Sequence, residues 1–279
     1  MASSNPAFNN SPAFSDRAKV AGSFPIAAPP ATADMSAQQL TELYSQPSAT
    51  PVETDRMSYE DVMVKIVISF AVLLGGAAVG WFVPVLWIPA ALVGFVLALV
   101  NIFKKKPSPA LVLLYAAVEG VFVGGITVFF ENMWPGIAIQ AVIGTAAVIG
   151  VTFALFASGR VRASAKATKV FLIAMVGYAV FSIVNLILMA TGVNKDAFGL
   201  RSVEIPIPFI GVTVPLGVII GILVVVMAAY SLVLDFDSIK TGVTRGAPRV
   251  YGWTAAFGIM VTVVWLYLEI LRILALLRR

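Results

Sequence analysis

Two residue types that carry much of protein chemistry are absent from this chain, whose 279 residues include no cysteine and no histidine. The lack of cysteine excludes disulfide bonds and thiolate metal sites. The lack of histidine removes the commonest pH switch and the commonest transition-metal ligand. Any proton sensing by this protein must therefore rely on carboxylates.

Charged residues are also scarce, at 12% of the chain, whereas 59% of it is hydrophobic. This composition is too apolar for a soluble domain of this length and predicts a polytopic membrane protein. The net charge of +5 comes mostly from loops beside apolar segments, so it does not indicate nucleic-acid binding. The sequence has no P-loop, no histidine metalloprotease motif and no Gly-x-Ser-x-Gly elbow, so we expect neither an enzyme nor a bound cofactor.

The N-terminal region differs sharply from the rest of the chain. It is rich in proline, serine and alanine, and Pro-Ala-Phe occurs at both 6–8 and 12–14. Such a segment cannot bury enough apolar surface to offset the entropy of ordering it. We therefore predict a disordered cytosolic tail over residues 1–57 and a transmembrane domain over residues 58–279.

Seven apolar segments follow, each close to the roughly 20 residues that a helix needs to span a bilayer. The predicted fold class is therefore an all-α integral membrane protein, a seven-helix transmembrane bundle behind a disordered tail. The expected spans are 62–83, 85–103, 109–130, 137–157, 168–191, 212–234 and 253–275.

Basic residues are concentrated in alternate connections, after the second, fourth and sixth spans. By the positive-inside rule, these loops and the N-terminus lie in the cytoplasm. Seven crossings then place the C-terminus outside, where Arg278 and Arg279 conflict with the rule. The alternative is that the last helix enters the bilayer and returns.

Glycines recur at a spacing of four within three of the spans, which lets helix backbones approach closely in a membrane. The pairs are Gly76 and Gly80 in the first span, Gly120 and Gly124 in the third, and Gly217 and Gly221 in the sixth.

Three acids lie within or at the end of the expected spans: Glu119, Asp235 and Glu269. A charge at bilayer depth costs a few kcal/mol, so such residues usually face the bundle interior or a partner. Asp237 follows two residues after Asp235 and points about 200° away from it on a helix. We expect Asp235 to face the bundle and Asp237 to face the aqueous loop.

These acids also have structural explanations. Glu269 and Arg272 are three residues apart and can neutralise each other on a helix. Asp235 can be a solvated helix terminus, and Glu119 can be hydrogen-bonded to a neighbouring helix. The functional interpretation is that Asp235 and Glu269 lie together. Two such carboxylates would share a proton near neutral pH or, when both are ionised, attract a divalent cation for a short time.

Three segments resemble motifs of the Bax inhibitor-1 family of transmembrane BAX inhibitor motif proteins, in its bacterial branch. They are residues 115–124, 232–239 and 266–270, and the resemblance covers residues 58–277. It implies a seven-helix fold with a central helix, and a pH-sensitive calcium leak governed by two acids on the last two helices. Asp235 and Glu269 take those places, with Glu where the family commonly has Asp. A basic residue that locks the pair in some members has no clear match, and Lys104–Lys106 are the nearest candidates.

The leading hypothesis is a Ca²⁺ leak channel gated by protonation of Asp235 and Glu269, with Glu119 lining the route or supporting the pair. The protonated pair is expected to hold the cytosolic half closed, and the separated, ionised pair to open it. Its expected partners are the lipid bilayer, Ca²⁺ and H⁺, in a bacterial cytoplasmic membrane. One alternative is a membrane protein that regulates a partner such as a membrane protease. Another is a proton-coupled transporter, although the sequence lacks a convincing inverted repeat.

Overall fold

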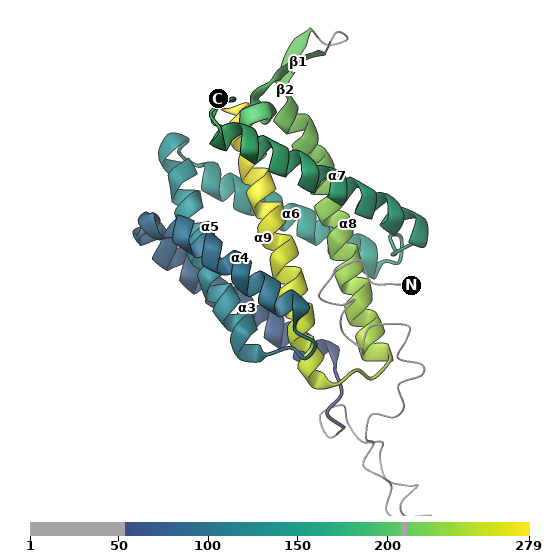
Figure 1. Ribbon diagram of the computed structural model, residues 1–279. Coiled ribbons are helices and arrows are strands. Elements are labelled where there is room, and N and C mark those ends of the chain that lie inside the picture. The colour runs from purple at the N-terminus through teal and green to yellow at the C-terminus, as the bar shows by residue number, and fades with distance from the viewer. Residues whose placement is uncertain (1–53, 208–210) are drawn as a thin grey trace, which may run out of the picture.

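A computed structural model describes residues 54–207 and 211–279 of the chain (Figure 1). Within this part, seven helices are long and apolar enough to cross a membrane, as the sequence predicted. They are α3 (Tyr59–Phe82), α4 (Trp87–Phe103), α5 (Pro109–Met133), α6 (Ile137–Ala157), α7 (Ala165–Ala190), α8 (Leu216–Thr244) and α9 (Gly252–Leu277). The predicted tail lies almost entirely outside the described residues.

Local sequence signals explain where several helices begin. The Ser58 side chain accepts a hydrogen bond from the backbone nitrogen of Asp61 at 3.2 Å and caps α3. Pro84 opens a short 3-10 helix, Pro84–Leu86, which turns the chain from α3 into α4. Pro109 is the first residue of α5, a position where its missing N–H costs no helical hydrogen bond.

The predicted sixth span is wrong at both ends. Residues 212–215 belong to strand β2 (Val212–Pro215), which pairs antiparallel with β1 (Glu204–Ile207). β-branched residues and prolines suit a short exposed hairpin, whereas a hydropathy window reads the same residues as helix. At its other end α8 runs ten residues beyond position 234, to Thr244. Asp235 and Asp237 therefore both lie inside the helix.

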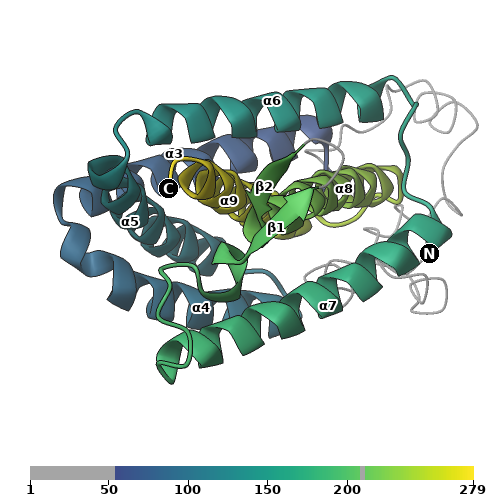
Figure 2. The same ribbon diagram turned by 90° about the horizontal axis from the view of Figure 1, so that it is seen from above.

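Helix α9 occupies the centre of the bundle. Viewed from above, the other helices surround it (Figure 2). Most of its residues are buried, and its Met260, Val264 and Leu271 belong to the main hydrophobic core. By contrast, α7 buries only Phe171 and Asn185 and lies at the periphery.

Helices α3 and α5 pack through glycines, as the sequence predicted. A Cβ placed on Gly124 would lie 1.9 Å from the backbone oxygen of Ala77, and one on Gly76 would lie 2.2 Å from that of Ala117. These distances leave no room for any side chain at either position, so the two helix backbones are in direct contact.

Both ends of the bundle are tied by contacts between distant segments. One end is here called the basic end because it carries the basic connections that follow α4 and α8. There the Met57 backbone nitrogen donates to the Ala247 oxygen at 2.7 Å. At the other end, here called the hairpin end because it carries β1 and β2, Arg279 pairs with Asp196 at 3.2 Å. Arg278 donates there to the Pro135 carbonyl at 3.0 Å. Helix α9 thus runs from one end to the other, and its C-terminal arginines bind loops of the hairpin end.

Candidate functional site

Glu269 is fully buried on α9, with 0% of its surface exposed. Its Oε1 accepts a hydrogen bond from Arg201 at 3.1 Å. Its Oε2 accepts one from the Tyr178 hydroxyl at 2.8 Å and another from Arg272. The pairing of Glu269 with Arg272 that the sequence offered as a structural explanation is therefore present, and Arg201 adds a second cation.

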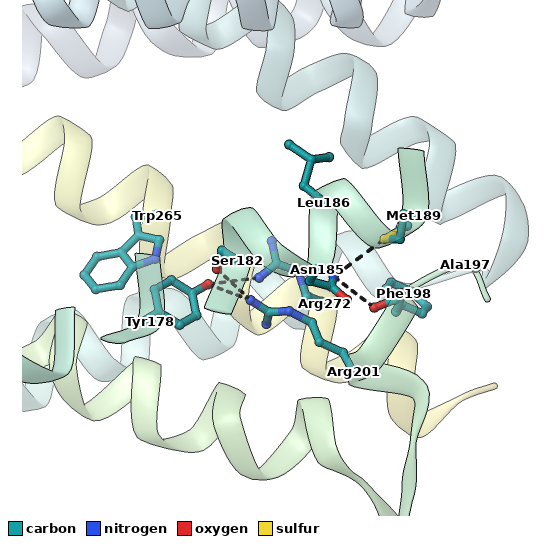
Figure 3. A pocket seen from close by; sticks show the side chains of 10 residues that line it. All are labelled: Tyr178, Ser182, Asn185, Leu186, Met189, Ala197, Phe198, Arg201, Trp265 and Arg272. Atoms are coloured by element: carbon teal, nitrogen blue, oxygen red, sulfur yellow. Dashed lines mark hydrogen bonds between the residues drawn. The ribbon is translucent and has the colours of Figure 1, made fainter. Parts of the chain in front are cut away.

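Arg201 reaches Glu269 from the short 3-10 helix η4 (Gly199–Ser202), which follows α7. Asn185 of α7 holds this helix in place, since its Oδ1 accepts from the Leu200 backbone nitrogen at 2.6 Å. Its amide donates to the Phe198 carbonyl at 3.3 Å, as Figure 3 shows. Gly199 has φ +60°, and a Cβ there would lie 2.3 Å from Oδ1 of Asn185. These contacts of Asn185, called the Asn185 clamp from here on, therefore require glycine at position 199.

Aromatic rings and hydroxyls complete the environment of Arg201. Its guanidinium lies 5.3 Å from the ring centroid of Tyr178 and 5.5 Å from that of Phe181, within the range of cation–π attraction. Its Nη2 donates to the hydroxyls of Tyr178 at 3.1 Å and Ser182 at 3.4 Å. Tyr178 contacts Arg201, Arg272 and Glu269, so α7 takes part in the ion pair.

Asp235 is equally buried, with 0% of its surface exposed, on the face of α8 that meets α9. The Thr262 hydroxyl of α9 donates to its Oδ2 at 2.7 Å. Ser231, one turn earlier on α8, lies 3.3 Å from the same threonine oxygen. The prediction that Asp235 faces the bundle is consistent with this contact, whereas its explanation as a solvated terminus is wrong.

Asp235 of α8 and Glu269 of α9 lie at different heights along the axis of α9. Thr262, which binds Asp235, precedes Glu269 by seven residues. Seven residues are almost two turns, so the two levels share one face of α9 and are about 10 Å apart along its axis. Both oxygens of Glu269 are engaged by α7, η4 and α9. The expectation that the Asp235 and Glu269 carboxylates pair directly is therefore wrong for this conformation.

The other two predicted acids lie elsewhere. Glu119 is half-buried between α5 and α4, where its Oε2 would be 2.8 Å from a Cβ placed on Gly94. Asp237 is half-buried on α8, two residues after Asp235 and so on a different face of the helix. In the described part of the chain, the hydrogen bonds of Glu269 come from Tyr178, Arg201 and Arg272, and from neither of these two acids.

Sequence reasoning missed Arg201, which it counted only as a loop charge. Lys104–Lys106, the nearest candidates for a locking base, are exposed at the basic end. No local signal identifies Arg201, because its partner is 68 residues away.

A second ion-pair cluster lies at the basic end. Lys65 of α3 binds the Asp61 carboxylate and donates to the Arg249 carbonyl at 2.6 Å. The Arg249 side chain in turn donates to Asp61 at 2.7 Å. These contacts join the start of α3 to the connection between α8 and α9. Across residues 54–207 and 211–279, no group of three or more acidic side chains is placed to hold a metal ion.

The comparisons with known proteins agree with the three motifs in the sequence. A family model described as Bax inhibitor 1 like matches residues 5–279. The match extends well into the N-terminal tail, which the motif resemblance over residues 58–277 left out. In a comparison with curated proteins, none matches the chain.

Proposed function

Because this chain belongs to the Bax inhibitor 1 like family, we propose that it is a membrane leak channel for cations, Ca²⁺ first among them, controlled by Asp235 and Glu269. It is an integral membrane protein with seven apolar helices that would sit in a lipid bilayer. What we propose beyond this is the identity of the ion and the nature of the gate, and the two buried acids support both.

The observation that carries the proposal is the full burial of two carboxylates on adjacent membrane-spanning helices. Removing a charge from water costs several kcal/mol unless partners compensate. A bundle that needed only packing could use apolar residues at both positions. The protein instead surrounds each acid with polar side chains, Thr262 and Ser231 at one level of α9 and Tyr178 at the other. We take this polar seam between α8 and α9 as the route of the ion.

The ion pairs of Glu269 provide the gate. In the present conformation Arg201 and Arg272 neutralise this carboxylate, and their positive charges oppose the passage of a cation. Protonation of Glu269 would remove its attraction for both arginines, free η4 and α7 to move, and open the seam. Asp235, near the basic end, would then supply hard oxygen ligands to Ca²⁺. Acidic pH is thus expected to raise the leak, the opposite of the direction expected from the sequence, because Glu269 is paired with arginines and not with Asp235.

Calcium flux into proteoliposomes between pH 5 and neutral pH tests this proposal. We expect Glu269→Gln, which mimics the protonated acid, to leak at all pH values, and Asp235→Asn to leak little. Asp237→Asn is the matched control, since it removes the same charge from a different face of α8. If the pH dependence of the flux is unchanged in both Glu269→Gln and Asp235→Asn, the proposed gating mechanism is wrong. The absence of flux from the wild-type protein at every pH would overturn the channel and favour the regulatory role.

A further inference from the structure

The cavity that adjoins the ion pair of Glu269 carries unbalanced charge. It has a volume of about 480 Å³ and lies between α7, η4 and α9 (Figure 3). Arg201 and Arg272 both line it, and none of the described residues lining it is acidic. Two guanidinium groups share the single carboxylate of Glu269, so the cluster keeps one excess positive charge. A partly buried excess charge of this kind favours a bound counter-ion.

Arg272 has donors available to such a ligand. Its Nη1 serves both Glu269 and Tyr178, whereas its Nε and Nη2 have no acceptor among the residues that the structure describes. Its side chain is 31% exposed, compared with 6% for Arg201. Arginine presents its donors as a planar fork that matches the oxygens of phosphate. The hydroxyls of Tyr178 and Ser182 line the same cavity.

The position of the cavity indicates where its ligand comes from. Arg272 is five residues from the end of α9 at Leu277, or about 8 Å along the axis. A helix of 26 residues is about 39 Å long, whereas the hydrocarbon core of a bilayer is about 30 Å thick. Arg272 is therefore expected near the boundary between acyl chains and headgroups. Leu186, which lines the cavity on α7, is 65% exposed, so the mouth opens on the outer surface of the bundle.

We propose that this cavity binds the phosphate of an anionic phospholipid from the leaflet at the hairpin end. The phosphate oxygens accept from Nε and Nη2 of Arg272, and the apolar lining from Leu186 and Trp265 accommodates the start of the acyl chains. A soluble phosphate ester offers the same group without those chains. The binding does not depend on the proposed leak, because the phosphate uses donors of Arg272 that Glu269 does not use.

The full-length protein in nanodiscs of phosphatidylcholine provides the test. Phosphatidylglycerol is titrated in and its binding measured by native mass spectrometry, with glycerol 3-phosphate as the soluble competitor. We expect Arg272→Gln to weaken phosphatidylglycerol binding at least tenfold. Arg279→Gln removes the same charge from the same end of α9, outside the cavity, and should leave binding unchanged. Competition by glycerol 3-phosphate at equal concentration would assign the site to soluble phosphate esters and overturn the lipid assignment.

A second pair of variants leaves the ion pair intact, in case Arg272→Gln fails to fold. Leu186→Asp places a negative charge at the mouth of the cavity and should weaken binding at least threefold, whereas Leu186→Asn should not. Equal binding of phosphatidylcholine and phosphatidylglycerol by the wild-type protein would overturn the proposal. Equal losses in Arg272→Gln and Arg279→Gln, or in Leu186→Asp and Leu186→Asn, would overturn it as well.

Discussion

Arg201 donates a hydrogen bond to Oε1 of Glu269 at 3.1 Å and thereby joins η4 to the central helix α9 across 68 residues of sequence. Both side chains are almost completely buried. This ion pair connects the peripheral helix α7, through Tyr178, to the buried acid that we propose as the gate.

Arg201→Gln should destabilise the protein strongly. Removing one partner of a buried ion pair typically costs about 3–5 kcal/mol, because the remaining charge stays buried. Here Arg272 still neutralises Glu269, so we expect a loss near the lower end of that range. The midpoint of thermal unfolding in detergent measures it. As a control, Arg279→Gln breaks the exposed pair with Asp196 and should cost no more than about 1 kcal/mol. Similar losses in the two variants would contradict the conclusion that Arg201 forms a buried, stabilising ion pair with Glu269.

Thr262→Val should affect Asp235 in particular. Valine keeps the shape of threonine but removes the hydroxyl that donates to Oδ2 of Asp235. Removing a donor from a buried acceptor costs about 1–3 kcal/mol. We expect lower thermal stability and a changed size of the calcium flux, since Asp235 is proposed to supply ligands to the ion. The control is Thr145→Val, because the Thr145 hydroxyl donates to the Ala141 carbonyl of its own helix and so binds no other helix in the described part of the chain. An equal shift in flux for the control would rule out a special role for the contact with Asp235.

Gly124→Ala should disrupt the packing of α3 against α5. The new methyl group would lie 1.9 Å from the Ala77 backbone oxygen, so the helices must separate. Overpacking of this kind typically costs about 1–3 kcal/mol. Gly75→Ala is the matched control on α3, since nothing lies within 4 Å of a Cβ at that position. Thermal unfolding of both variants should show a loss for Gly124→Ala alone.

Single cysteines test the direction of the chain through the membrane, because the natural sequence contains none to interfere. Lys105→Cys lies in the connection after α4, and Val193→Cys lies at the hairpin end. A thiol reagent that cannot cross membranes should label Val193→Cys in intact cells and should label Lys105→Cys only after lysis. Labelling of both from the same side would contradict the seven-span path, and the reverse pattern would invert the orientation.

The seven spans could be predicted from the sequence because the bilayer imposes a local rule. Each segment must satisfy its own backbone hydrogen bonds over a fixed thickness, so length and hydropathy are enough to locate a helix. Close packing at Gly76 and Gly124 was predictable for a similar reason, since small residues at helical spacing permit direct backbone contact. The unusual positions of Asp235 and Glu269 were also visible, because charges are rare in apolar segments.

Only the tertiary structure decided which partners these acids have on other elements. The sequence indicated Arg272 as a partner of Glu269, but the second arginine, Arg201, comes from a short 3-10 helix whose position depends on the Asn185 clamp. Strand β2 before α8 was mistaken for part of a span. The same holds for Arg278 and Arg279, which conflict with the charge rule yet bind loops at the hairpin end. Local sequence determines where each helix lies, because its hydrogen bonds are internal. Pairing between buried charges depends on the relative placement of helices far apart in the chain, which no local pattern encodes.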